Sequence, residues 1–278
     1  MKTKRAAAFS LIELLIVITI IMILAGLLLP ALRGVRERAK AIVCQSNLRD
    51  IGNALNLYEQ EYGMYPVVPP PYGAYSCTEF GFGGQQGSGA PDPSCADGGA
   101  GLPVALRPLN RFFEQQGAGT SKIKTFRCPS DKGIWWTGYG GYNNLWETFG
   151  NSYQIPRYGN PGGNEAPDIG SIYKWDGSKL VGLRRAGIVA PARKIMVLEP
   201  PIWYQTAGCD DPHNWRHFFK SSTAGYPPYP MGYAVFADGS VRYLVRDHGV
   251  AGYNSPNCTA YTAWATNAGA PDPAHDWY

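Results

Sequence analysis

The sequence predicts an α+β fold, in which one long N-terminal helix, transmembrane and then amphipathic, packs on a small antiparallel β-sheet head with long disulfide-bonded loops. Three observations predict it. An apolar run occupies positions 9–32, apolar residues recur at helical spacing as far as position 62, and an Asp-Gly pair separates two β-prone runs near the C-terminus. We expect residues 1–8 to form a leader, 9–32 a membrane helix, 33–62 its amphipathic continuation and 63–278 a globular head.

Composition favours an exported protein with many loops. The 278 residues include 18 Tyr, 8 Trp, 34 Gly and 23 Pro, whereas disordered chains lack aromatic residues. The formal charge is +4, from 25 basic and 21 acidic residues, but three of the bases lie in the first eight residues and leave 22 against 21. A nucleic-acid-binding protein needs a basic face rather than a basic leader, so we expect no nucleic-acid partner.

The apolar run is long enough to cross a membrane. Its polar side chains are Ser10, Glu13 and Thr19, and 24 residues at about 1.5 Å each exceed a hydrocarbon core of about 30 Å. A secretory signal peptide and a plain signal anchor remain as alternatives. A signal peptide has an apolar region of about 7–15 residues, which is shorter than this run, so a membrane helix is favoured.

Glu13 is a costly residue in such a run. A charge at bilayer depth costs about 2.5–3.5 kcal/mol on insertion scales, and such charges are usually paired and functional. The basic residues nearest in sequence precede the apolar run or begin at Arg33. We therefore expect the partner of Glu13 to arise by processing of the chain or to come from another subunit.

The N-terminus resembles that of type IV prepilins and type II secretion pseudopilins. The resemblance is carried by the short basic leader, the sequence AFSLIE at 8–13, the apolar run and Pro30. It implies that a prepilin peptidase cuts between Ala8 and Phe9 and that the new Phe9 amine is N-methylated. The family usually has Gly before the cut, where this chain has Ala8. Pro30 lies where such helices often lose regularity in the filament.

Cleavage would create the cation that Glu13 requires. In a staggered bundle, Glu13 of one subunit can neutralise the Phe9 ammonium of its neighbour, so that each buried charge offsets the cost of the other. The resemblance implies a precursor in the bacterial inner membrane and then a periplasmic or cell-surface filament. The expected function is a structural subunit of a type IV pilus-like or type II secretion filament, with copies of itself and other pilins or pseudopilins as partners.

Beyond Ala31 the pattern indicates one amphipathic helix that continues the membrane helix. Its apolar stripe, which we expect to pack on the head, consists of Leu32, Val35, Ala39, Ile42, Cys44, Leu48, Ile51, Leu55, Tyr58 and Tyr62. Gly34 and Gly52 should weaken the helix locally. Gly63, followed by Pro66, should end it.

The strongest strand signal in the head is a hairpin over 232–245, because Asp238-Gly239 separates two alternating β-prone runs. Residues 194–199 form a second predicted strand, which Pro200 ends. These strands predict a small antiparallel sheet over the helix stripe. The sequences CQSNLRDIGNALNLYEQEYGMYP, FRCPSD and FADGSVRYL resemble a large group of pseudopilin-like proteins, whose His before the hairpin has its nearest counterpart in His217.

Six cysteines in an exported chain favour disulfides, although six cysteines allow fifteen connectivities. Cys77 with Cys95 would close a Gly-rich loop, and Cys209 with Cys258 would tie the C-terminal loops across the hairpin. The remaining pair, Cys44 with Cys128, would join the helix stripe to the FRCPSD segment, which we expect to be strand-like. The resemblance supports this last pair.

We expect no enzyme activity, because the sequence lacks HExxH, GxSxG and Walker motifs. The cofactor expected is none, apart from a structural calcium for which Glu199 and Asp238 are candidate ligands. Asp238 is also the residue that the hairpin turn demands. The aromatic content leaves an alternative function, a membrane-tethered or tip-located binding protein with a carbohydrate-binding head. Trp135 and Trp136 are its most conspicuous candidates.

Overall fold

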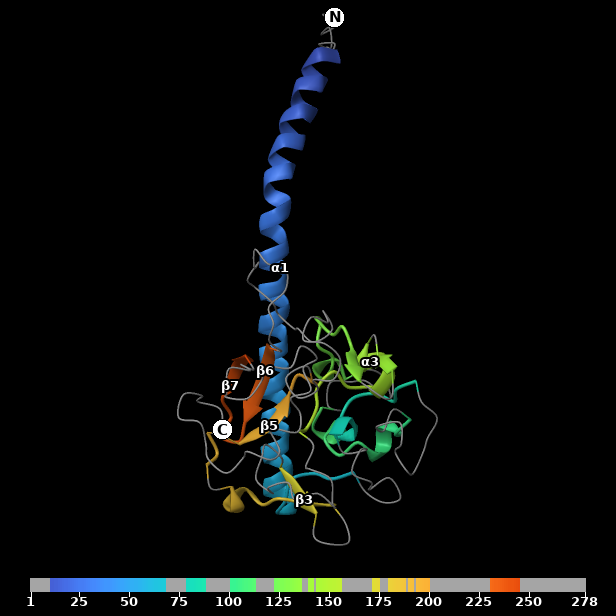
Figure 1. Ribbon diagram of the computed structural model, residues 1–278, viewed down its shortest axis with the longest axis vertical. Helices are drawn as coiled ribbons and strands as arrows, with labels where there is room; N and C mark the ends of the chain where they lie inside the picture. The colour runs from blue at the N-terminus through green and yellow to red at the C-terminus, as the bar shows by residue number, and fades with distance from the viewer. Residues whose placement is uncertain are drawn as a thin grey trace, which may run out of the picture.

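The structure is a computed structural model in which a globular head surrounds the C-terminal part of one long helix (Figure 1). The other part of the helix extends away from the head and curves gently. The description that follows covers residues 11–68, 79–88, 101–113, 123–136, 140–142, 144–156, 172–175, 180–188, 190–192, 194–200 and 231–245.

Helix α1, Leu11–Tyr62, is continuous over 52 residues and passes through Pro30 without a break. At about 1.5 Å per residue, its length is about 78 Å. Gly63 ends the helix in the left-handed region, with φ of 75°, and its N–H donates to the Glu59 carbonyl at 2.7 Å. The predicted continuation of the membrane helix and its predicted end are therefore confirmed.

The buried face of α1 begins only at Ala41. Cys44, Leu48, Ile51 and Leu55 are fully buried, together with Ala41 and Ala54 at 3% exposure. The first part of the predicted stripe does not pack on the head, since Leu32, Val35, Ala39 and Ile42 are exposed. These four residues keep helical spacing among themselves, but at 3.6 residues per turn they lie on the face of the helix opposite Cys44 and Leu48, so the predicted stripe changes face between Ile42 and Cys44.

A three-stranded antiparallel sheet packs on this buried face. Its strands are β5, Ile195–Leu198, β6, Met231–Phe236, and β7, Val241–Val245, in the order β5-β6-β7. On β6, Tyr233 and Val235 join the core that contains the helix residues, whereas Ala234 and Phe236 join a second buried cluster on the opposite face. This alternation is the period-two pattern of a strand, and both faces of β6 are covered.

The predicted hairpin is present, but its turn differs from a two-residue Asp-Gly turn. The Gly239 N–H donates to the Phe236 carbonyl at 2.8 Å, and the Phe236 N–H donates to the Ser240 carbonyl at 2.9 Å. The connection is therefore a three-residue loop in which Gly239, with φ of 87°, supplies the left-handed residue. Asp238 accepts from the Ser240 N–H and hydroxyl and so stabilises this loop.

The rest of the described head consists of short elements that the sequence did not predict. They are the hairpin of β1, Ile134–Trp136, with β2, Gly140–Tyr142; the hairpin of β3, Tyr173–Trp175, with β4, Leu180–Gly182; helix α3, Leu145–Phe149; and the 3-10 turns Val104–Leu106, Asn110–Phe112, Lys124–Phe126 and Arg185–Gly187. Trp135 and Trp136 lie opposite Gly141 and Gly140 in β1 and β2. The side chains of these two tryptophans are outside the described part of the structure.

Arg107 organises the loops that lack regular structure. It is 2% exposed, and its guanidinium donates to the carbonyls of Phe80 at 3.1 Å, Gly83 at 2.8 Å, Phe149 at 2.7 Å and Leu102 at 3.4 Å. Burial lowers the pKa of Arg107 to about 9, so the group is still protonated at neutral pH. One cation thus ties together backbone segments that are far apart in the sequence.

We predict that Gly52→Ala destabilises the protein, although alanine favours helices. A Cβ at position 52 would lie 2.8 Å from Val235 Cγ2 and 3.6 Å from Met196 Cε. Overpacking a core typically costs about 1–3 kcal/mol, which exceeds the gain in helix propensity of about 1 kcal/mol. Gly34→Ala is the control, because nothing lies within 4 Å of a Cβ there. Denaturant unfolding of the full chain in detergent should give a higher free energy of unfolding for Gly34→Ala than for Gly52→Ala. Equal free energies would contradict a close helix–sheet approach.

We predict that Arg107→Met lowers the free energy of unfolding by about 3 kcal/mol or more, since several buried carbonyls lose their donor. The matched control is Arg111→Met. Arg111 is half exposed and pairs with Glu61 at 2.8 Å, and a pair of this kind typically contributes below about 1 kcal/mol. The same denaturant titration measures both variants. If the two lose similar amounts of stability, Arg107 does not hold the loops together.

Candidate assembly site: the apolar helix and its joint with the head

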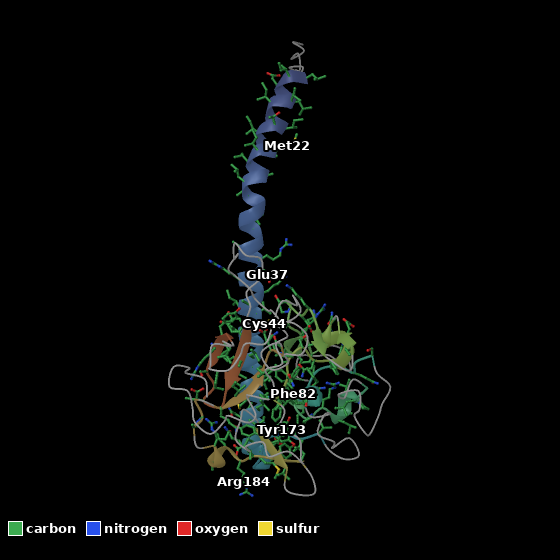
Figure 2. The ribbon with its side chains drawn as sticks, in the orientation of Figure 1. Met22, Glu37, Cys44, Phe82, Tyr173 and Arg184 are labelled. Atoms are coloured by element: carbon green, nitrogen blue, oxygen red, sulfur yellow. The ribbon has the colours of Figure 1, made fainter. Side chains whose placement is uncertain are left out.

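The N-terminal part of α1 presents apolar side chains in every direction. The segment Leu11–Leu28 is long and apolar enough to cross a membrane, and none of it is buried in the head. Met22, for example, is 64% exposed and stands on the bare part of the helix, far from the head (Figure 2). A helix that is apolar on all sides requires an apolar environment, which lipid or other helices can provide.

The two polar side chains described in this segment have different consequences. The Thr19 hydroxyl donates to the Leu15 carbonyl at 2.7 Å, so its polarity is satisfied within the helix. Glu13, by contrast, places a carboxylate in the apolar part of the helix, where a charge is costly. Ala8 and Phe9 are outside the described residues, and for Pro30 only the helical backbone is described. Their roles in processing and assembly stay predictions.

Polar contacts join helix α1 to the head at the point where the helix enters the head. Glu37 accepts from Lys40 at 2.6 Å and from the Ser130 hydroxyl at 3.2 Å. Partial burial alone would raise the pKa of Glu37, but these hydrogen bonds and the nearby lysine charges lower it. One turn after Cys44, the Asn47 side chain donates to the Arg127 carbonyl at 3.0 Å.

The head side of this joint is the FRCPSD segment, residues 126–131. The prediction of a strand-like segment was wrong, because a 3-10 turn ends at Phe126 and a second turn follows. Asp131 explains the difference: its carboxylate accepts from the backbone N–H groups of Gly133 and Trp146, both at 2.9 Å, and from the Ser152 hydroxyl at 2.6 Å. A Pro-Ser-Asp sequence is typical of such side-chain-stabilised turns, and this signal was available in the sequence.

Two of the predicted disulfide cysteines lie side by side inside this joint. Cys44 is 0% and Cys128 1% exposed, and their sulfurs lie with a Glu199 oxygen in a cluster whose atoms are all within 4.8 Å of one another. The sulfurs are not bonded to each other. The Cys128 thiol donates to Glu199 Oε1 at 3.3 Å, and the Tyr233 N–H donates to Glu199 Oε2 at 2.8 Å. The structure therefore brings the predicted partners together as thiols, and the bond itself stays a prediction.

The other predicted site residues are distributed differently. Cys77, Cys95, Cys209 and Cys258 lie outside the described residues, so those two pairs stay predictions. His217 is also outside them. Within the described part, the group of Cys44, Cys128 and Glu199 is the one arrangement of three or more potential metal-ligating side chains, and Asp238 is not part of it.

The geometry around the calcium candidates does not resemble a calcium site. Asp238 already accepts from Ser240 and, at 3.5 Å, from Arg242. Burial alone would raise the pKa of Asp238, but the hydrogen bonds from Ser240 and the Arg242 charge lower it. Glu199 shares its surroundings with two sulfurs, whereas calcium takes oxygen ligands. Asp238 therefore acts as a turn residue here.

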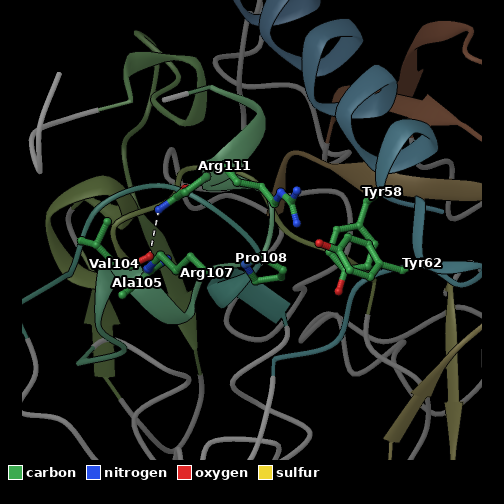
Figure 3. Close-up of a pocket in the computed structure, with 8 residues that line it drawn as sticks. Tyr58, Tyr62, Val104, Ala105, Arg107, Pro108 and Arg111 are labelled. Carbon is green, nitrogen blue, oxygen red and sulfur yellow. Dashed lines mark hydrogen bonds between the residues drawn. The ribbon is translucent and has the colours of Figure 1, made fainter. Parts of the chain in front are cut away.

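A small cavity of about 240 Å³ lies beside the last turn of α1 (Figure 3). Tyr58, Tyr62 and Pro108 line it, and the Tyr58 and Tyr62 rings pack with centroids 4.4 Å apart. The Arg111 guanidinium lies 5.3 Å from the centroid of Tyr62 while it pairs with Glu61. These aromatic and charged groups contact one another, and the cavity is at the end of α1 remote from its apolar segment.

Residues 3–29 match the family model described as the prokaryotic N-terminal methylation motif. The chain carries a prepilin N-terminus. The chain is 35% identical over 68 residues to the type II secretion system core protein G of Aeromonas hydrophila and 36% identical over 66 residues to that of Escherichia coli K12. It is also 42% identical over 62 residues to the type IV wide pilus major component PilA4 of Thermus thermophilus. The resemblance expected from the sequence is thereby confirmed.

These matches cover about a quarter of the chain. They span 24%, 24% and 22% of this chain and 48%, 46% and 47% of the three relatives, in the order given above. The chain therefore spans about half the length of the relatives that it matches. No solved structure matches the chain. The apolar helix, the antiparallel sheet and the prepilin N-terminus together are consistent with a pilin fold.

Proposed function

We propose that this protein is a structural subunit, a pilin or pseudopilin, of a type IV pilus-like or type II secretion filament. The observation that carries the proposal is the division of α1 into two parts. Residues from Ala41 to Leu55 bury one face in the head, whereas Leu11–Leu28 expose apolar side chains on all sides. The free part is a means of association with other apolar helices, and the prepilin N-terminus supports this use.

The same segment suits two successive environments. Before assembly, the 18 residues of Leu11–Leu28 at about 1.5 Å each can occupy most of the hydrocarbon core of a membrane. After assembly, helices of neighbouring subunits would replace the lipid around it. The prepilin motif and the apolar helix fit a precursor in the inner membrane and a periplasmic or surface filament.

Glu13 then has a role in register. A carboxylate in an apolar bundle is costly, but a Phe9 ammonium of a neighbouring subunit would offset the cost by forming a charge pair. Because such a pair forms at only one axial offset between helices, it would select the stagger of the subunits. Prepilin peptidase, copies of this chain and other pilins or pseudopilins are the partners in this scheme.

The relatives of the chain are structural proteins, and we propose no catalytic role. The alternative, a tethered or tip-located binding protein, would require a ligand surface on the head. In the cavity beside Tyr58 and Tyr62, the aromatic rings contact each other and Arg111, and Arg111 contacts Glu61. This arrangement favours structural packing over carbohydrate binding at that cavity.

We predict that Glu13→Gln leaves membrane insertion intact or improved and reduces incorporation into filaments, because the charge that pairs with Phe9 is lost. Glu13→Asp is the matched control, since it keeps the charge on a shorter side chain and should retain more incorporation than Glu13→Gln. The measurement compares each variant in sheared filament fractions with the same variant in the membrane fraction.

The N-terminus of each variant must be established by mass spectrometry of the first tryptic peptide, which should begin with methylated Phe9. If correctly processed Glu13→Gln enters filaments as efficiently as the unaltered chain, the charge pair does not drive assembly. If the chain is processed but never enters any filament, the subunit function itself is wrong.

A further inference from the structure

The joint between helix and head contains a buried group that assembly through the apolar helix does not use. Cys44 lies in the first buried turn of α1, Cys128 lies in the segment after a 3-10 turn, and Glu199 directly follows β5. Three segments far apart in the sequence thus place two sulfurs and a carboxylate oxygen within 4.8 Å of one another. Cys44 marks the point where the helix enters the head (Figure 2).

The backbone around the two sulfurs is held by separate contacts. Asn47, three residues after Cys44, donates to the carbonyl of Arg127, the residue before Cys128, at 3.0 Å. The same amide donates to the Tyr153 hydroxyl at 3.1 Å. Tyr153 is buried and lies beside both Cys44 and Cys128. The helix and the 126–131 segment are therefore aligned here without help from a covalent bond.

We propose that Cys44 and Cys128 are oxidised to a disulfide that clasps α1 to the head, and that Glu199 accepts the proton of the Cys128 thiol in this reaction. The clasp rests on the proposed function to the extent that export places the head in an oxidising compartment. Its chemistry depends on the three side chains alone.

The oxidant is a disulfide, either of a thiol–disulfide oxidoreductase or of a small molecule. The Cys128 thiol gives its proton to Glu199, and its thiolate attacks one sulfur of the oxidant. That step forms a mixed disulfide and releases one oxidant thiolate, which takes up a proton. Cys44 then attacks the Cys128 sulfur and displaces the second oxidant thiolate, which takes up the proton that the Cys44 thiol loses. Two electrons pass from the two cysteines to the oxidant, which leaves as two thiols.

Geometry identifies Cys128 as the attacking thiol. Glu199 Oε1 lies 3.3 Å from the Cys128 sulfur and accepts its hydrogen bond. The other oxygen, Oε2, is held by the Tyr233 N–H at 2.8 Å, which keeps Oε1 oriented toward the sulfur. Cys128 and Glu199 both belong to the head, where β5, β6 and the 126–131 segment hold them together, whereas Cys44 belongs to helix α1.

Burial determines when the bond forms. Cys44 is 0% and Cys128 1% exposed, so an oxidant has no access to either sulfur once the helix is docked. The mixed disulfide must therefore form at Cys128 while α1 is undocked, and docking of the helix lets Cys44 displace the oxidant. The completed bond is equally inaccessible to reductants in the folded protein.

Peptide mapping of the full exported chain tests the clasp directly. Trypsin cuts after lysine and arginine, so Cys44 falls in the peptide 41–49 and Cys128 in the peptide 128–132, each with a single cysteine. We expect these two peptides to be joined in non-reduced protein alkylated under denaturing conditions. The join should disappear in Cys44→Ser and in Cys128→Ser.

Three results would overturn the clasp: both thiols alkylated in exported protein, Cys44 joined to a different cysteine, or a stoichiometric metal ion bound by Cys44 and Cys128. The readout requires no filament. A chain that forms the clasp but enters no filament would contradict the proposed function alone. A chain that enters filaments with both thiols alkylated would contradict the clasp alone.

The role of Glu199 is tested by rate. The full chain is reduced, denatured and refolded in detergent with oxidised glutathione, and the linked pair of peptides is quantified over time. Glu199→Gln should form it at least about tenfold more slowly, as for loss of a positioned proton acceptor. Glu79→Gln is the matched control, since Glu79 is also buried and accepts from Gln154 at 3.3 Å. Equal rates for Glu199→Gln and the unaltered chain would overturn the proton transfer, and slowing by both variants would assign the effect to folding.

Discussion

The close contact between α1 and β6 at Gly52 determines how the rest of the head is placed. Without a side chain at position 52, the helix approaches Val235 until even a Cβ would clash. The sheet then covers the helix from Ala41 to Leu55, and the outer face of the same sheet buries a second apolar cluster. A sheet covered on both faces can be small and still stable, because each strand contributes to two cores.

The remainder of the head shows how loops can be ordered with little regular structure. Arg107 and Asp131 act in complementary ways, one as a buried donor to carbonyls and the other as an acceptor from N–H and hydroxyl groups. Each satisfies backbone groups that would otherwise be buried without partners, which is the main energetic difficulty of a loop-rich interior. The head is therefore sensitive to substitution of Arg107 or Asp131, since the loss of either side chain affects several segments at once.

The features that could be predicted from the sequence depend on local patterns. The helix, its end at Gly63 and the 232–245 hairpin follow from spacing and turn chemistry within a few residues. The start of helix burial was not predicted, because Leu32 and Val35 have helical spacing but lie on the face opposite Cys44 and Leu48, and the change of face was read as one continuous stripe. Similarly, the proximity of Cys44 to Cys128 was expected, but Glu199 beside them was not, since its position depends on long-range packing of β5.

The four residues between Leu32 and Glu37 have a mechanical consequence for the precursor. They are helical, so they separate the end of the apolar run from the first described contact with the head by about 6 Å. A headgroup layer is about 5–8 Å thick, so the described part of the head would begin near the outer level of the headgroups. A domain on such a stiff stalk can rotate about the helix axis before docking, and each subunit can present its correct side to a growing polymer without first detaching from the bilayer.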